Sequence, residues 1–477
     1  MRRSALFASA AFALAALPAA PARAEEPVTS REPRLLRETG ENTTVIDALD
    51  DDDPFDATLS ATFRQQWKSA NVRRESYLQQ SGYATGGFTP ATANVASYSQ
   101  SVTTLELGAD IGIWKDLALS LRLPFILADR RALEAPDGST ADPERLGDGS
   151  GQELFAVPMR SPTRSGVDWI GVGLSYAILN QQRDDTKPTW VIGAEGRFAV
   201  GSRIRACNDG APVKCPDPIN PALSRDPGIS RGMNTYVVQT VFSRRLGYVE
   251  PYAGFRFLAE TPQGNTDFAR SSATRGTIRS APPMIGTMTV GVEVFPWERR
   301  ETFSRLGLDF KLRGSYHSAG RDYSELFDAL GSSQAGSLRA PNPARYQAGP
   351  APNTSVADPN GPKVYFDGIT DQTAFGSFGA SSGVTWQAGE YVKFTAGLGL
   401  TYAQSHLVTA ADACHPDFKG DPGASGPCRS SAASPGSPVV TGIPNPNHRP
   451  AIDLPGRRFS VDDTTIVDLW LSGVVMF

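Results

Sequence analysis

The sequence predicts an all-β fold, a single antiparallel transmembrane β-barrel of about twelve strands with short turns at one end and long loops at the other. Three observations support this prediction. Twelve segments alternate polar and apolar residues with a period of two, which is typical of strands with two different faces. The connections between these segments are alternately short and long. Beyond the first 24 residues no apolar run reaches about 18 residues, so no helix is expected to cross a bilayer.

The composition excludes two other classes of protein. The mean hydropathy of −0.27 argues against a helical inner-membrane protein. The formal net charge of −4 over 477 residues excludes the basic surface of a nucleic-acid-binding protein, so no nucleic-acid partner is expected. Gly (46) and Pro (37) are plentiful and helical periodicity is nearly absent, which favours many short strands over helical domains.

The N-terminal region has the pattern of a secretory signal peptide. Arg2 and Arg3 precede an apolar stretch at residues 5–17, and Ala22-Arg23-Ala24 supplies small residues for cleavage. We therefore expect residues 1–24 to be a signal peptide.

Residues 25–55 are expected to form a disordered acidic segment in the periplasm, followed by the barrel over residues 56–477. The acidic segment ends in a run from Asp50 to Asp53. This run is a solvated linker, a contact for a periplasmic partner or a calcium ligand, although it does not by itself form the curved oxygen cage that calcium needs. The prediction is therefore that no metal or other cofactor is bound.

The twelve segments are each about long enough to cross a bilayer at the tilt of a barrel strand. They span residues 57–68, 97–113, 117–128, 167–179, 189–200, 234–245, 248–260, 284–295, 304–317, 373–387, 391–405 and 462–477. The pattern is clearest in the third, where every second residue from Leu117 to Leu127 is apolar, and in the eleventh, from Val392 to Tyr402.

The connections indicate the orientation. Short ones separate long ones of roughly 20 to 55 residues, which matches short periplasmic turns and long extracellular loops. The short connections lie at residues 114–116, 180–188, 246–247, 296–303 and 388–390. An even strand count then puts both ends of the barrel in the periplasm. Placing Ile113 opposite Leu117 across the first short turn brings the apolar residues of both strands to one face.

Outward-facing aromatic residues are predicted to form two girdles, as at the two interfaces of a membrane. At the periplasmic ends they are Tyr176, Trp190, Phe242, Trp386 and Phe477, and at the outer ends Trp67, Phe198, Tyr236, Phe257, Tyr316 and Tyr402. A soluble β-sandwich, the other fold with alternating strands, accounts for neither the girdles nor the unequal loops.

Counting back by twos from Phe477 gives Val475, Gly473, Leu471, Leu469 and Val467, a mostly apolar file. This strand resembles the last strand of Gram-negative outer-membrane β-barrels. The resemblance implies location in the cell outer membrane, contact with its lipid, and recognition of Phe477 by the barrel assembly machinery as an assembly signal. Residues 166–173 resemble strands of barrels proposed to pass small organic solutes.

The inward faces carry charges of both signs at mid-barrel. The candidate lumen-lining residues are Glu106, Asp110, Arg122, Glu195, Arg197, Glu250, Arg256, Glu293, Arg305, Asp309, Lys311, Arg313, Lys393 and Asp468. Arg122 lies opposite Gly108 and can reach Glu106 or Asp110. Such pairs either satisfy charges in a filled interior or line a hydrated pore. Two adjacent cations, Lys311 and Arg313, favour some water.

Four cysteines fall in two outer loops. We expect the disulfides Cys207–Cys215 and Cys414–Cys428, because secreted chains with cysteines at short spacing usually form local bridges. His415 beside Cys414 leaves a metal site as the alternative, but the spacing of a zinc site is lacking.

No catalytic residue is predicted. The histidines His317 and His406 fall at the outer rim, where solvated side chains are expected. In the fifth long loop, residues 321–331 read as a short amphipathic helix ending at Gly331. This helix either constricts the barrel mouth or covers neighbouring loops.

The function expected from the sequence is a narrow channel or transporter for small or linear polar solutes. A non-conducting barrel that anchors an envelope machine for motility, secretion or polysaccharide export is the alternative from another class. An outer-membrane hydrolase is the third.

Overall fold

The structure is a computed structural model, and it describes residues 46, 48, 56–76, 91–136, 146–209, 215–220, 223–264, 268, 281–344, 346–348, 355–389, 391–415 and 443–477. The expected signal peptide, nearly all of the acidic segment, including Asp50 to Asp53, and Cys428 lie outside this part of the chain.

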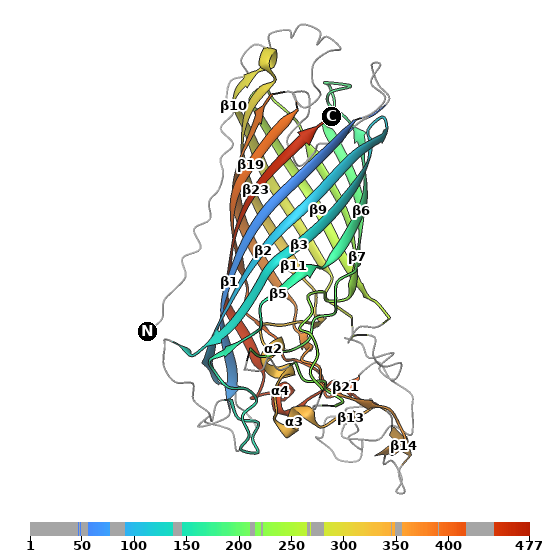
Figure 1. The fold of residues 1–477 in the computed structure, drawn as a ribbon, viewed down its shortest axis with the longest axis vertical. Coiled ribbons are helices and arrows are strands. Elements are labelled where there is room, and N and C mark those ends of the chain that lie inside the picture. Colours follow the sequence, from blue (N-terminus) through green and yellow to red (C-terminus); the bar gives the residue numbers. More distant parts are fainter. Residues whose placement is uncertain are drawn as a thin grey trace, which may run out of the picture.

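Twelve antiparallel strands form one closed barrel (Figure 1). They are β1 (Ala57–Ser76), β2 (Ala91–Trp114), β3 (Leu117–Glu134), β6 (Trp169–Leu179), β7 (Thr189–Ala199), β8 (Met233–Ser243), β9 (Val249–Pro262), β10 (Ile285–Arg299), β11 (Ser304–His317), β18 (Phe375–Ala388), β19 (Val392–Ala403) and β23 (Phe459–Met476). Each pairs with its neighbour in sequence, and β23 returns to pair with β1. The predicted fold and all twelve predicted strands are confirmed.

The first three strands run further at their outer ends than predicted. β1 continues to Ser76, β2 begins at Ala91 and β3 ends at Glu134. Within the membrane the apolar residues of β1, such as Trp67, face outward and are exposed. Beyond Ser69 the apolar residues, such as Val72, face inward and are buried. The polarity of the two faces therefore inverts where the strands leave the lipid.

The register across the first short turn differs from the prediction by one residue. Trp114, not Ile113, lies opposite Leu117, and Gly112 lies opposite Ala118. Ile113 is the extra residue of a β-bulge next to the turn, so the expected register holds from Gly112 opposite Ala118 to Thr104 opposite Ile126, where it shifts again.

The long connections gather at one end of the barrel (Figure 1). Their regular elements are short: β4 (Met159–Arg160), β5 (Arg164–Val167), β12 (Gly320–Asp322), α2 (Phe327–Gly331), α3 (Gly336–Arg339), β13 (Asn342–Pro343), β14 (Tyr346–Ala348), β15 (Ser355–Ala357), β16 (Lys363–Val364), β17 (Thr370–Gln372), β20 (His406–Leu407), β21 (Cys414–His415), β22 (Ile443–Pro444) and α4 (Pro450–Asp453). A 3-10 turn, η5 (Arg300–Thr302), lies in a short connection at the other end. In the described residues, no helix is long and apolar enough to cross a membrane.

We call the described residues within 146–168, 200–232, 318–374, 404–415 and 443–458 the cap. The cap has its own hydrophobic core, which packs on the inner faces of the strand extensions. From the loops this core includes Leu154, Leu326, Leu330, Leu338 and Ile452, and from the strands Val72, Val95, Tyr98, Leu133 and Phe459. A folded unit therefore occupies the outer end of the barrel.

The amphipathic helix predicted at residues 321–331 is shorter than expected. Only Phe327–Gly331 is helical, because residues 320–322 pair with β17 instead. The predicted apolar face does find a partner: Leu326 and Leu330 enter the cap core, and Phe327 enters a second cluster with Tyr323.

Labelling from outside the cell tests the orientation. In a chain whose native cysteines are replaced, we expect Lys115→Cys and Gly389→Cys, in short turns, to resist a membrane-impermeant thiol reagent on intact cells. Asp358→Cys, in a long loop, should react. Lysed cells provide the control, because all three variants should then be labelled. Labelling of the short-turn variants alone on intact cells would invert the orientation.

Candidate functional site

The outer face of the barrel is an apolar band that ends in aromatic residues. All the predicted girdle residues are exposed except Trp190, which is half-buried against the ring of Phe242 at 5.0 Å. Above the band, the outward residues of the extensions become polar, as at Arg73 and Arg130. Closed barrels with such a band cross outer membranes. The chain is an outer-membrane β-barrel.

Inside the barrel, large side chains lie across glycines of neighbouring strands. A Cβ atom added to Gly397 would come 2.0 Å from the ring of Trp470, and one added to Gly291 would come 2.4 Å from the ring of Tyr252. Glycine is therefore required at both positions for the ring to lie flat against the wall. Sequence reasoning named neither aromatic residue as a site residue, although both lie on inward faces.

One side of the interior carries ion pairs between adjacent strands. The Nη2 atom of Arg122 donates to Asp110 Oδ1 at 2.8 Å, so Asp110, and not Glu106, is its partner. Across the β1–β23 seam, Arg64 Nε donates to Asp468 Oδ1 at 2.7 Å. Sequence reasoning missed Arg64; the alternation of β1 with exposed Phe63 would have placed it inside.

The opposite side carries pairs within single strands. Arg197 Nε donates to Glu195 Oε1 at 2.7 Å, and the guanidinium lies 4.5 Å from the ring centroid of Trp169. Lys311 Nζ lies 3.4 Å from Asp309 Oδ2, and the Tyr252 hydroxyl donates to Asp309 Oδ1 at 2.6 Å. Four predicted acids, Asp110, Asp468, Glu195 and Asp309, thus each have a basic partner.

Nearer the periplasm, three carboxylates lie abreast. Glu293 on β10 is opposite Glu250 on β9 and opposite Asp309 on β11, and both glutamates are buried. In the next rows, Arg305 is buried with its guanidinium 5.0 Å from the ring centroid of Phe295, and Lys393 lies opposite Gln387. That these residues line a solute path stays a prediction.

Two inward arginines differ from the rest. In the described residues, neither Arg256 nor Arg313 forms an ion pair or a hydrogen bond, and Arg256 Nε is buried without a partner. Leu312 faces the lipid, so the next residue, Arg313, points into the barrel. Its side chain is nevertheless exposed to solvent. The interior around Arg313 is therefore accessible to water.

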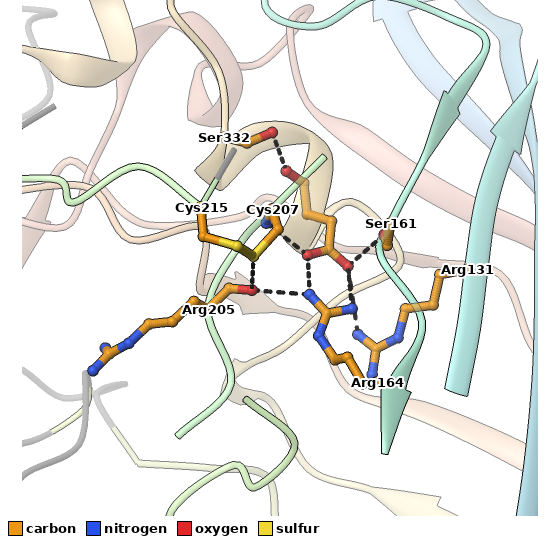
Figure 2. The surroundings of a disulfide bond; sticks show 8 residues. Arg131, Ser161, Arg164, Arg205, Cys207, Cys215 and Ser332 are labelled. Atoms are coloured by element: carbon orange, nitrogen blue, oxygen red, sulfur yellow. Dashed lines mark hydrogen bonds and ion pairs between the residues drawn. A yellow bond between two sulfur atoms is a disulfide. The ribbon is translucent and has the colours of Figure 1, made fainter. Parts of the chain in front are cut away.

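A buried carboxylate, Asp328 of α2, holds the cap together. Arg164 donates to both of its oxygens, at 2.5 and 3.1 Å, and this arginine side chain is fully buried. Ser161 Oγ donates at 2.7 Å and the backbone N–H of Cys207 at 3.0 Å. Figure 2 shows Arg131 approaching from the strand side; its Nη1 atom is 3.9 Å from Asp328 Oδ2. Segments from three loops meet at this one residue.

The disulfide predicted between Cys207 and Cys215 is present, closing eight residues of sequence beside this carboxylate (Figure 2). The predicted bridge from Cys414 to Cys428 lies outside the described residues. The cap is also tied to the barrel wall, because Lys68 Nζ of β1 donates to the buried Glu325 Oε1 at 2.5 Å.

The rim histidines are not the solvated side chains expected. His317 and His406 stack on opposite sides of Phe375, with ring centroids 4.3 and 3.8 Å from it. The His406 Nδ1 atom lies 3.0 Å from the Gln404 carbonyl, and His448 Nδ1 lies 2.9 Å from the Ala411 carbonyl. His406 is buried, and His317 and His448 are half-buried, because the cap covers them and supplies aromatic and carbonyl neighbours in place of water.

A second carboxylate in the cap, Asp453, is placed for titration near neutral pH. It accepts the backbone N–H groups of Arg449 at 2.7 Å and Ala411 at 3.2 Å. Burial raises the pKa of Asp453 to about 7, and the negative charge of Asp371 acts in the same direction. The positive charge of Arg321, which pairs with Asp371, opposes the shift.

No family model and no curated protein matches the chain. Solved structures with a similar shape include an outer membrane channel from Pseudomonas putida F1, with 10% identity and a TM-score of 0.40, covering 92% of this chain and 99% of that one. A FadL homologue of Pseudomonas aeruginosa has 10% identity and a TM-score of 0.30, over 88% and 90% of the two chains. The outer membrane protease OmpT of Escherichia coli has 8% identity and a TM-score of 0.26, over 88% and 97%. At these values the likenesses support no conclusion about function.

Removing the charge of Asp328 should loosen the cap and spare the barrel. Asp328→Asn leaves the buried Arg164 without its counter-charge, at a cost of about 3–5 kcal/mol in cap stability. Hydrogen exchange of cap amides should accelerate while the heat resistance of the barrel is kept. Asp358→Asn, in the same long loop but not buried, is the matched control. Unchanged exchange in Asp328→Asn would contradict the role of this residue.

The stability of the cap should fall as pH rises from about 4 to about 7. The folded pKa of Asp453, about 7, lies above its ordinary value of 3.8, so folding takes up a proton in this window. The resulting stabilisation is full below pH 3.8 and is lost as pH passes 7. Hydrogen exchange of cap amides, corrected for the intrinsic rate, measures it. The same pH slope in Asp453→Asn would show that another group is responsible.

Proposed function

We propose that this protein is a channel for small polar solutes, with a narrow interior that the cap controls from the outside. The observation that carries the proposal is water-accessible polar surface within the barrel. The inward side chain of Arg64 is 51% exposed, and the inward residues Gln239 and Arg313 are also exposed. A barrel filled by its own side chains would bury them.

The paired charges support the same proposal. Arg122 with Asp110, Arg64 with Asp468 and Arg197 with Glu195 each keep their charges on the wall. Their side chains are partly exposed, so they are solvated as well as paired. Such a wall favours polar solutes over apolar ones, because a polar solute exchanges hydration for hydrogen bonds with the wall.

The cap supports control at the outer end. Its core joins loops to the inner faces of β1, β2, β3 and β23. Contacts such as the one between Lys68 and Glu325 tie it to the wall. A solute entering from outside must pass this unit, so we propose that movement of the cap limits the flux.

A non-conducting structural barrel is the second candidate, favoured by the same packed cap. In that case the cap would be a permanent closure, and the acidic segment at residues 25–55 would bind a periplasmic partner. Backbone hydrogen bonds of 2.9 and 2.8 Å join Ala48, within this range of residues, to Lys115 in the first short turn. We prefer a channel to a hydrolase, because the Nδ1 atoms of His406 and His448 each lie within hydrogen-bond distance of a backbone carbonyl.

Single-channel recording in a planar bilayer tests the channel. The purified protein should conduct, and Lys311→Gln with Arg313→Gln should shift the reversal potential in a KCl gradient toward cation selectivity, because fixed lumen charge sets the sign of the permeant ion. Arg160→Gln, an exposed cap arginine, is the control for a lost charge outside the lumen. Background conductance in every variant, with lowered heat resistance in the double variant, would instead favour the structural barrel.

A further inference from the structure

The inner wall formed by β9, β10 and β11 places two cations across a row of hydroxyl groups. Arg256 on β9 lies opposite Thr287 on β10, and Thr287 lies opposite Ser315 on β11. One row nearer the periplasm, Thr289 lies opposite Arg313. The two arginines therefore stand on either side of β10, offset by one row.

This spacing lets both guanidinium groups reach one small ligand. Adjacent strands are about 4.8 Å apart, so the backbones of β9 and β11 are separated by about 10 Å. An arginine side chain is long enough to cover much of that gap from each side. The hydroxyls between them can donate as well: Thr287 Oγ1 and Ser315 Oγ are 3.0 Å apart, so one of the two protons is free to point elsewhere.

The charges at this site are unbalanced. Arg256 and Arg313 have no ion-pair partner in the described part of the chain, and Arg256 Nε is a buried donor without an acceptor. Among the described residues, the positive charges of Arg197 and Arg313 repel that of Arg256, and the negative charge of Glu195, already paired with Arg197, opposes this repulsion. An unsatisfied buried donor beside like charges is costly unless an acceptor with negative charge is supplied.

The nearest acids on the periplasmic side of the site include Asp309, which already has partners of its own. Asp309 accepts the Tyr252 hydroxyl and pairs with Lys311, and Glu250 and Glu293 lie at its level, two rows beneath Arg313. Viewed along β10 from the outer end, the order is a cationic level and then an anionic level. The cationic level is the one with unsatisfied donors.

We propose that Arg256 and Arg313, with the hydroxyls of Thr287, Thr289 and Ser315, form a binding site for a small oxyanion such as a phosphate or a dicarboxylate. Planar guanidinium groups donate in pairs to carboxylate and phosphate oxygens, which fits two arginines converging on one ligand. The inference rests on the proposed channel and names its substrate class: small anionic solutes bound midway along the barrel. Gln239, opposite Arg256 on β8, extends the site on one side.

Calorimetry on the detergent-solubilised full-length barrel tests binding without requiring conduction. Inorganic phosphate and succinate are the probes, at low ionic strength. We expect binding to the wild type, and affinity at least about tenfold weaker in Arg256→Gln with Arg313→Gln, as for the loss of charge-assisted hydrogen bonds. Arg256→Lys with Arg313→Lys should keep part of the affinity, and Arg160→Gln should keep all of it.

The same variants separate a binding site from a structural role. Removing the two repelling cations in the double glutamine variant should leave the heat resistance of the barrel equal or higher, whereas loss of structural cations would lower it. In bilayers, millimolar phosphate should reduce the chloride current of the wild type and have much less effect on the double glutamine variant. Binding without conductance would contradict the proposed channel but support the binding site. No binding to the wild type, or equal binding to the double glutamine variant, would overturn the site whether or not the channel conducts.

Discussion

The closure of the sheet between its first and last strands is the constraint on which the rest of the structure depends. β1 pairs with β23 from Thr58 opposite Met476 to Arg74 opposite Phe459. In lipid, each backbone donor and acceptor must be satisfied within the sheet, and only closure removes both edges. The closed register also fixes which residues face the lumen. The Arg64–Asp468 pair, which joins residues 404 apart in sequence, exists only because this seam is in register.

The transmembrane strands were predictable because their signal is local. A strand between lipid and lumen must alternate, and the pattern is visible within a dozen residues. The outer ends of β1, β2 and β3 were missed for a physical reason. Above Ser69 the outside becomes aqueous and the inside becomes the cap core, so Ala70 and Val72 are apolar on the inner face while Asn71 and Arg73 are polar on the outer face. The alternation continues, but the apolar residues change from the outer to the inner face. In the sequence this change resembles the end of a strand.

The interior of the cap could not be predicted in the same way. Asp328 and Arg164 are 164 residues apart, and nothing near either residue indicates its partner. The Cys207–Cys215 bridge was within reach because its two cysteines are close in sequence. The contacts in the lumen could be predicted only in part. Alternation places a residue on the inner wall, but the partner of Arg122, chosen between two acids, is set by the strand register and side-chain geometry of the folded barrel.

Two tryptophan rings lie over glycines inside the barrel, so the tryptophans of the molecule are in two different environments that fluorescence can distinguish. Of its seven tryptophans, Trp169 and Trp470 are on the inner wall, where they contact Gly171 and Gly397. The other five, Trp67, Trp114, Trp190, Trp297 and Trp386, lie on the outer face or at the ends of the strands that carry it. Fluorescence quenched by a brominated lipid therefore comes from the outer set. Trp169 and Trp470 are out of reach of the lipid but not of a dissolved ion that enters the barrel, so the chain carries native reporters for both of its surfaces.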